Sequence, residues 1–131
     1  MLASPETLFF DIPNAAQPDG THRMTCYRWG DPGAVRTILC VHGLTRNGRD
    51  FDYLADALAV DSCVLCPDMP GRGKSQWLMD PAGYNNGAYI ADLAFLLRVL
   101  NISQVDWIGT SMGGILGMMM ANAAPGLIRR L

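Results

Sequence analysis

The chain has 131 residues, of which half are hydrophobic and 17% are charged. This composition excludes intrinsic disorder, which requires low hydrophobicity and high net charge. The formal net charge is −2 and no basic block is present, so nucleic acid is not an expected partner. The length corresponds to one domain by the rough guide of about 100–200 residues per domain.

The amino-terminal segment does not resemble a secretory signal peptide. Residues 1–10 include Glu6 and lack a basic stretch before an apolar one. No apolar run reaches the roughly 18–20 residues of a membrane-spanning helix, because glycines and Asn122 interrupt residues 112–124. We therefore expect a cytoplasmic protein with no membrane partner.

Four cysteines raise the question of a metal or redox site. The spacing Cys63-x-x-Cys66 is that of half a zinc site, but a second pair is missing. The residues from 62 to 66 are typical of a strand, on which positions three apart point to opposite faces. We expect Cys26, Cys40, Cys63 and Cys66 to be reduced core thiols, with no metal bound.

The first part of the chain predicts two short strands. Residues 8–12 and 24–29 are strand-like, and the turn-forming residues 13–20 separate them. We assign residues 1–22 to an edge segment and residues 23–131 to the core sheet and helices.

From residue 36 onward, predicted strands and helices alternate. The continuous apolar run before His42 is typical of a strand that is buried on both faces of a parallel sheet. Apolar residues at offsets of three and four indicate the helices. The expected order is strand 36–41, helix 49–58, strand 63–66, helix 88–100, strand 105–109 and helix 112–124. This order predicts an α/β fold with a mostly parallel sheet flanked by helices.

The alternation stops abruptly at the carboxyl terminus. Residues 127–131 resemble the approach to another strand, and no helix follows them. An exposed sheet edge promotes aggregation. We therefore expect a fragment, truncated after the helix at residues 112–124, or else a chain that pairs with a separate carboxyl-terminal half or with a second copy.

The residues Gly109-Thr110-Ser111-Met112-Gly113 match the pattern G-x-S-x-G. They lie between a predicted strand and a predicted helix, which is the context that this motif requires. A sharp turn there exposes the serine hydroxyl, and the small flanking residues let neighbouring segments approach. We predict that Ser111 is a nucleophile; the alternative is a structural serine in a glycine-rich packing turn.

Two further motifs accompany this turn. His42 and Gly43 follow the strand at residues 36–41, and residues 68–75 read Asp-Met-Pro-Gly-Arg-Gly-Lys-Ser. In order and spacing, the three motifs resemble the α/β-hydrolase family, of the single-domain esterase type. The resemblance extends from about Arg23 to the end of the chain and covers only the first half of such a domain. It implies an α/β-hydrolase fold.

The resemblance also implies roles for individual residues. The backbone N–H groups of Leu44 and Met112 would form an oxyanion hole, which stabilises the negative charge of a tetrahedral intermediate. His42 and Gly43 would shape the loop of that hole; a general-base role for His42 is the alternative. Asp68 would brace the turn before the glycines of its motif.

Other polar residues carry weaker expectations. Arg46 follows the predicted oxyanion loop and is a candidate ligand for a substrate carboxylate, with a solvated loop arginine as the alternative. His22 is expected at the surface in an early turn. Asp106 is expected to be solvated or to cap a turn.

The catalytic triad is incomplete in this sequence. The family places its acid and its base histidine after the nucleophile, in the order Ser, Asp/Glu, His. Serine without a base is a poor nucleophile at neutral pH, so we expect little or no turnover from this chain alone. The full-length protein is predicted to be a serine hydrolase of small-molecule carboxylic esters or related acyl bonds, without a cofactor. The alternative is a non-catalytic remnant or interaction module.

Overall fold

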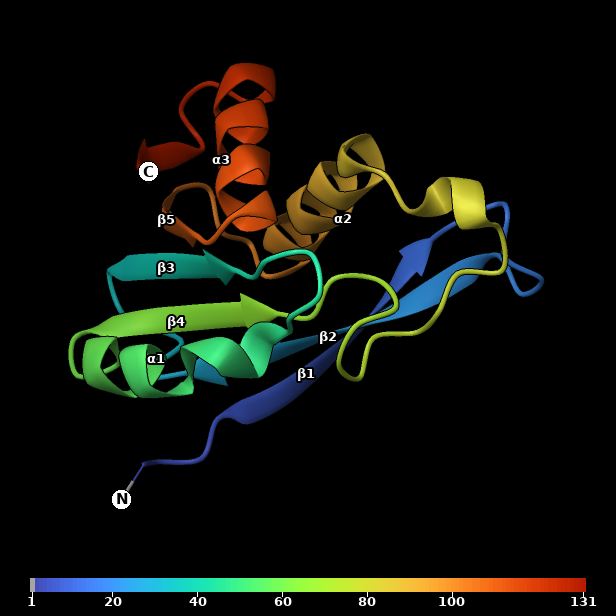
Figure 1. Ribbon diagram of the computed structural model, residues 1–131. Helices are drawn as coiled ribbons and strands as arrows, with labels where there is room; N and C mark the ends of the chain where they lie inside the picture. Colours follow the sequence, from blue (N-terminus) through green and yellow to red (C-terminus); the bar gives the residue numbers. More distant parts are fainter. Residues whose placement is uncertain (1) are drawn as a thin grey trace.

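The computed structural model describes residues 2–131, which form one six-stranded sheet with helices packed against it (Figure 1). The strands are β1 (Glu6–Pro13), β2 (Thr21–Trp29), β3 (Arg36–Val41), β4 (Ser62–Pro67), β5 (Val105–Gly109) and β6 (Ile128–Arg130). The helices are α1 (Asp52–Leu58), α2 (Asn86–Val99) and α3 (Met112–Ala123), with short 3-10 turns η1 (Gly48–Phe51) and η2 (Pro81–Gly83).

The strand order is β1-β2-β4-β3-β5-β6, and the sheet is mostly parallel. Strands β1 and β2 run antiparallel to their neighbours, whereas β4, β3, β5 and β6 run parallel to one another. In the centre, Leu39 of β3 pairs with Leu65 of β4 and with Trp107 of β5. The carboxyl ends of these three strands therefore meet at one edge of the sheet, where α/β proteins build their sites.

Helices cover both faces of the sheet. The side chains of Leu39 and Val41 pack into one core with α2 and α3, whereas Ile38 and Cys40 pack into a second core with α1. Side chains alternate between faces along a strand, so each central strand must be apolar at every position. The buried residues of β4, Ser62–Pro67, show the same effect.

The expected helix at residues 49–58 is divided in two. The Asn47 side chain accepts a hydrogen bond from the Arg49 N–H at 2.9 Å and starts the 3-10 turn η1. Gly48 lies so close to β4 that a Cβ there would be 2.5 Å from the Cys66 carbonyl oxygen. The chain therefore makes a tight turn against the sheet before α1 begins at Asp52.

The four cysteines are free and buried, and Cys63 and Cys66 face opposite cores as expected. Burial raises the pKa of the Cys26 and Cys63 thiols, so these groups are protonated at neutral pH.

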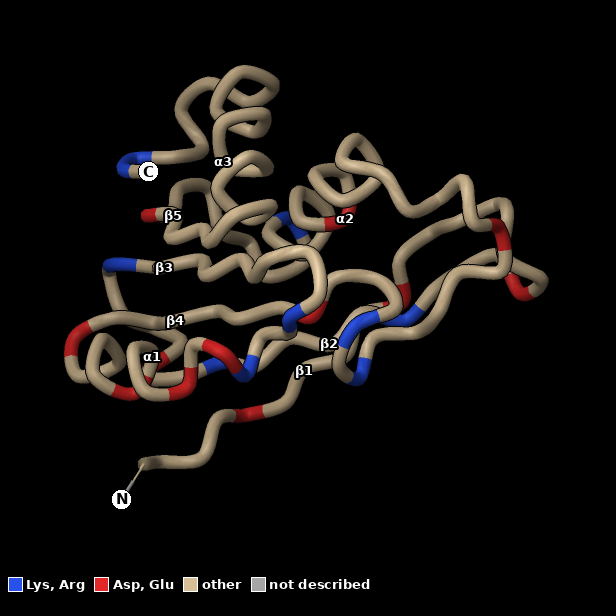
Figure 2. Tube along the Cα trace, viewed as in Figure 1, with Lys and Arg blue, Asp and Glu red and all other residues tan. Residues whose placement is uncertain are grey.

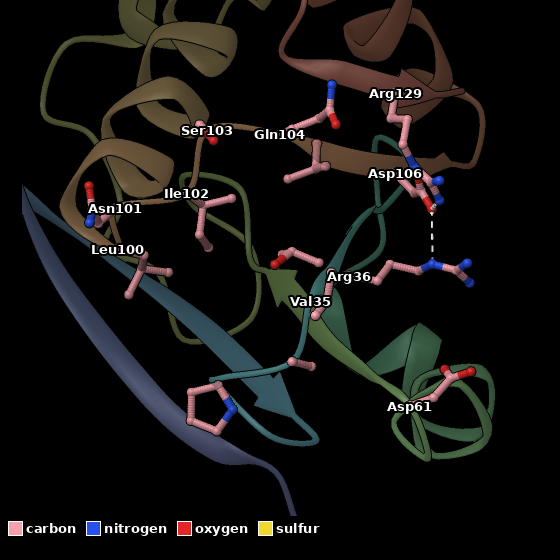
Figure 3. A pocket seen from close by; sticks show the side chains of 14 residues that line it. Val35, Arg36, Asp61, Leu100, Asn101, Ile102, Ser103, Gln104, Asp106 and Arg129 are labelled. Carbon is pink, nitrogen blue, oxygen red and sulfur yellow. Dashed lines mark hydrogen bonds and ion pairs between the residues drawn. The ribbon is translucent and has the colours of Figure 1, made fainter.

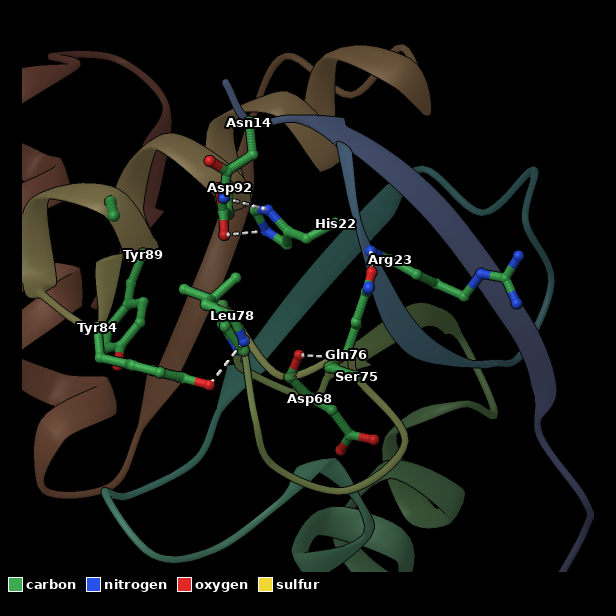
Figure 4. A network of polar contacts seen from close by, with 12 residues as sticks. Asn14, His22, Arg23, Asp68, Ser75, Gln76, Leu78, Tyr84, Tyr89 and Asp92 are labelled. Atoms are coloured by element: carbon green, nitrogen blue, oxygen red, sulfur yellow. Dashed lines mark hydrogen bonds and ion pairs between the residues drawn. The ribbon is translucent and has the colours of Figure 1, made fainter. Parts of the chain in front are cut away.

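The expected surface position of His22 is wrong. His22 lies in β2 and is buried, and its Nε2 is 2.9 Å from Oδ2 of Asp92 in α2 (Figure 4). Its Nδ1 is 3.0 Å from Nδ2 of Asn14, whose Oδ1 accepts the Ala16 N–H. The Asn14 Nδ2 group therefore faces His22 and donates to Nδ1. Nδ1 is thus an acceptor, and Nε2 donates its proton to the Asp92 carboxylate. The division that we expect after residue 22 lies within β2.

Charged residues are distributed over several elements, and acidic ones gather around α1 (Figure 2). None of the helices within residues 2–131 is long and apolar enough to cross a membrane.

Candidate active site

Ser111 occupies a strained and exposed turn between β5 and α3. Its backbone has φ 51° and ψ −115°, a conformation that side-chain-bearing residues rarely adopt and that clusters at functional sites. The turn is held by hydrogen bonds from Thr110 N–H to the Val41 carbonyl at 3.1 Å and from Gly113 N–H to the Thr110 carbonyl at 2.9 Å. Ser111 therefore lies at the tip of a sharp strand-to-helix turn, which is the context that the G-x-S-x-G pattern requires.

The glycines on either side of Ser111 are required by close packing. A Cβ at Gly109 would overlap the backbone of Gly113, and a Cβ at Gly113 would overlap the Val41 carbonyl oxygen. The Gly113 carbonyl in turn accepts a hydrogen bond from Trp107 Nε1 at 3.0 Å. The start of α3 therefore lies directly against β3 and β5, and this contact positions Ser111.

The loop after β3 lies beside the elbow. A Cβ at Gly43 would be 3.6 Å from the Ser111 Cβ. The Gly43 carbonyl accepts from His42 Nδ1 at 2.7 Å and from the Arg46 N–H at 3.1 Å. This carbonyl and the Leu44 N–H belong to one planar trans peptide group and point in opposite directions, so fixing the first also fixes the second.

Two backbone donors near Ser111 are free. Within residues 2–131, neither the Leu44 N–H nor the Met112 N–H donates to an acceptor. Met112 is the first residue of α3, where the N–H groups lack partners in the helix and the dipole favours negative charge. The two donors belong to the residues for which the resemblance to the α/β-hydrolase family implies an oxyanion hole.

His42 is buried, and both nitrogens of its ring are engaged. Nε2 accepts the Met69 N–H at 2.9 Å, and Nδ1 therefore carries the proton that it donates to the Gly43 carbonyl. Burial lowers the pKa of His42, which agrees with a neutral ring. Because Asn14 and Asp92 engage both nitrogens of His22, no imidazole of the described chain has a nitrogen free for Ser111.

Asp68 lies at the start of the turn that follows β4 and stabilises it by hydrogen bonds (Figure 4). Its Oδ1 accepts the Gly48 N–H at 2.7 Å, and its Oδ2 accepts the Lys74 N–H at 2.9 Å. Ser75 Oγ donates to the Asp68 carbonyl at 2.6 Å, and a Cβ at Gly73 would overlap the carboxylate. This buried carboxylate thus holds two loops together, as the sequence motif indicates.

Arg46 lies in the exposed part of the loop, where its guanidinium binds Asp50. Nε and Nη2 donate to the two carboxylate oxygens at 2.8 and 2.9 Å. Arg46, which is predicted to bind a substrate carboxylate, is thus already paired with a carboxylate of its own loop.

The expected solvated or capping position of Asp106 is wrong. Its carboxylate pairs with Arg129 of β6 at 2.7 Å and with Arg36 at 3.7 Å. The hydrogen bond from Arg129 lowers the pKa of Asp106. Asp106 and its two arginine partners line a hollow of about 700 Å³ at the amino ends of β3 and β5 (Figure 3). This hollow lies at the edge of the sheet opposite Ser111.

The sequence analysis missed Arg72, which binds the loop after β3. Its Nε donates to the Leu44 carbonyl at 3.0 Å. The signal in the sequence is its place inside the motif at residues 68–75.

Comparison with known proteins identifies the fold. Residues 36–131 match the sequence profile of the alpha/beta hydrolase fold. The chain belongs to the alpha/beta hydrolase family. The fold expected from the three motifs is thereby confirmed.

Similar proteins are named as hydrolases. A 3-hydroxybutyrate-oligomer hydrolase of Cupriavidus necator is 47% identical over the whole chain, which covers 44% of that protein. Lipase LipV of Mycobacterium tuberculosis is 34% identical over 104 residues, which are 79% of this chain and 38% of the lipase. An alpha/beta hydrolase structure from Novosphingobium aromaticivorans has a TM-score of 0.80 and 40% identity, over 98% of this chain and 43% of its own. The chain spans less than half the length of each.

Proposed function

We propose that this chain forms part of a serine hydrolase that cleaves carboxylic esters, with Ser111 as the nucleophile. The observation that carries the proposal is the strained, exposed turn of Ser111 beside the Gly43 loop. The free N–H groups of Leu44 and Met112 would receive the oxyanion, and His42 and Gly43 would hold the loop.

The chemistry is acyl transfer in two steps. Ser111 Oγ attacks the ester carbonyl carbon, its proton passes to a base, and the tetrahedral intermediate expels the alcohol. Water then hydrolyses the acyl-enzyme. Because both imidazoles of the described chain are engaged, we assign the base histidine and its acid to a segment outside residues 1–131. The chain alone would then have little or no turnover, and no step calls for a cofactor.

The relative from Cupriavidus necator supports a substrate class. Its name gives 3-hydroxybutyrate oligomers as its substrate, and its identity to this chain extends over all 131 residues. We therefore propose a short linear oligoester of a hydroxy acid as the small-molecule substrate, with Arg46 as the ligand for the terminal carboxylate. The buried, free cysteines suit a reducing compartment such as the cytoplasm.

The test uses the native polypeptide that contains residues 1–131, with a 3-hydroxybutyrate dimer and a neutral short ester as substrates. Ser111→Ala should lower kcat/KM by at least about 10³-fold, because the nucleophile is lost. Ser103→Ala, at an exposed position before β5, is the control and should keep full activity.

Two results would contradict the proposal. Activity that survives in Ser111→Ala would exclude this serine as the nucleophile. A wild-type protein that neither cleaves the two esters nor reacts at Ser111 with a fluorophosphonate would favour the non-catalytic binding module.

A further inference from the structure

The Arg72 guanidinium lies where three segments of the site meet. Its Nε donates to the Leu44 carbonyl at 3.0 Å, and its Nη1 donates to the Pro70 carbonyl at 2.9 Å. Nη1 also donates to the Tyr89 hydroxyl of α2 at 2.9 Å, and the guanidinium carbon lies 5.3 Å from the centre of that ring. One half-buried side chain therefore connects the oxyanion loop, the turn after β4, and α2.

Leu44 depends on its backbone for its conformation. The residue is 61% exposed, so little packing holds it in place. The peptide before its Cα is held through the Gly43 carbonyl, which accepts from His42 and from the Arg46 N–H. The peptide after its Cα is held through the Leu44 carbonyl, and in the described part of the chain only Arg72 donates to this oxygen.

We propose that Arg72 is a positioning residue for ester hydrolysis: the Gly43 carbonyl sets the direction of the Leu44 N–H, and Arg72 keeps it there by holding the peptide on the other side of Leu44. This inference rests on the proposed function. The conformation of Leu44 is set by the two peptide planes that meet at its Cα, and Arg72 holds the second plane. An oxyanion donor acts only if it is aimed before charge develops on the substrate oxygen, so a loosened plane weakens transition-state binding more than substrate binding.

Arginine suits this place better than lysine. Its planar guanidinium presents donors in a rigid fork, and here Nε and Nη1 reach carbonyls of two different loops while the plane lies by an aromatic ring. A lysine keeps the charge but cannot reproduce these directions. Arg72→Lys therefore separates geometry from charge.

The experiment compares Arg72→Lys with wild type and with Arg98→Lys in the native polypeptide that contains residues 1–131. Arg98 is the matched control, because it also lies over an aromatic ring, that of Phe95 at 5.8 Å, and is exposed at the end of α2. Rates are divided by the concentration of protein whose Ser111 reacts with a fluorophosphonate. Unfolded protein, which does not react, therefore does not lower the measured kcat.

For Arg72→Lys we expect kcat to fall about tenfold, which is less than the 10²–10³ lost when a donor is removed outright. KM should stay within about twofold, and the affinity for a trifluoromethyl ketone, which forms a tetrahedral adduct, should fall by the same factor as kcat. Arg98→Lys should match wild type. A kcat equal to wild type in Arg72→Lys, or a rise in KM alone, would overturn the proposal.

A second variant and a second measurement check the proposal independently of Arg72→Lys and of kcat. Tyr89→Phe removes one partner of the guanidinium and should lower kcat in the same direction, by about threefold, as expected for one hydrogen bond. Hydrogen exchange of the Arg46 N–H, which closes the loop on Gly43, should be faster in Arg72→Lys than in Arg98→Lys. If the wild-type protein cleaved no ester, the proposed function would fail. If the hydrogen exchange of the Arg46 N–H were unchanged in Arg72→Lys, Arg72 would be shown not to hold the loop, whatever the activity.

Discussion

At the scale of single residues, the side chains around Ser111 are mostly engaged with their own protein. His42 binds two backbone groups, Asp68 accepts from two loops, and Arg46 is paired with Asp50. Ser111 differs, because its turn is strained and exposed. This polar framework is satisfied internally and keeps the loops rigid, whereas the serine hydroxyl and the two free backbone N–H groups stay unengaged within residues 2–131.

The Arg46 pair gives a prediction about substrate charge. Asp50→Asn removes the competing carboxylate, so KM for an anionic oligoester should fall about two- to fivefold, the small effect that an exposed ion pair produces. Arg46→Ala should raise this KM, and KM for a neutral ester should change in neither variant. Asp52→Asn makes the same charge change beside Arg49 and serves as the control. If the KM for the anionic oligoester were unchanged in both Asp50→Asn and Arg46→Ala, Arg46 would be excluded as the residue that binds the substrate carboxylate.

At the scale of elements, the junction of β5 and α3 depends on direct backbone contact. Gly113 faces the Val41 carbonyl of β3, whereas a Cβ at the neighbouring Gly114 would meet no atom nearer than the Gly109 oxygen at 3.5 Å. The two glycines lie in the same helical turn, yet only Gly113 is too close to the sheet to accommodate a Cβ.

This difference predicts opposite effects of two alanine substitutions. Gly113→Ala should destabilise the protein by about 3 kcal/mol, because α3 must move away from β3. Gly114→Ala meets only ordinary contact and should stabilise it by up to about 1 kcal/mol through helix propensity. Thermal unfolding measures both. Equal shifts of Tm in the two variants would show that α3 is not in contact with β3 at this point.

At the scale of the whole molecule, buried polar pairs connect elements that are distant in sequence. His42 joins the loop after β3 to the segment after β4 through Met69, and His22 joins β2 to α2 through Asp92. Burial lowers the pKa of His42 and raises the pKa of Asp92. Folding therefore changes the proton affinity of both groups.

The lowered pKa of His42 predicts a loss of stability in acid. The folded state favours the neutral ring, so this contribution is complete above the ordinary histidine pKa of 6.5 and is lost as the pH falls toward the folded pKa. Tm of wild type should fall between about pH 7.5 and 5.5, and His42→Asn should be less stable at about pH 7.5 but less sensitive to pH. Asp92→Asn, which leaves His42 in place, should keep the acid loss. A pH slope unchanged in His42→Asn would contradict this account.

The sequence predicts much of the central sheet, because the relevant signals are local. The strands Arg36–Val41 and Val105–Gly109 have the expected bounds, since their apolar residues end at a polar loop or at glycine. The turn at Ser111 follows from glycines within two residues of it. The helix expected at residues 49–58 is wrong in its first turn, because the contact of Gly48 with β4 decides that turn.

The α/β alternation and the tight turn at Ser111 follow from the amino-acid sequence alone, because periodicity and turn chemistry depend on near neighbours. The partners of the buried polar groups depend instead on the tertiary structure. Asp92 lies 70 residues after His22, and Leu44 lies 28 residues before Arg72. Such pairs form only when packing brings two elements together, and a buried polar group then requires a partner that local sequence does not reveal.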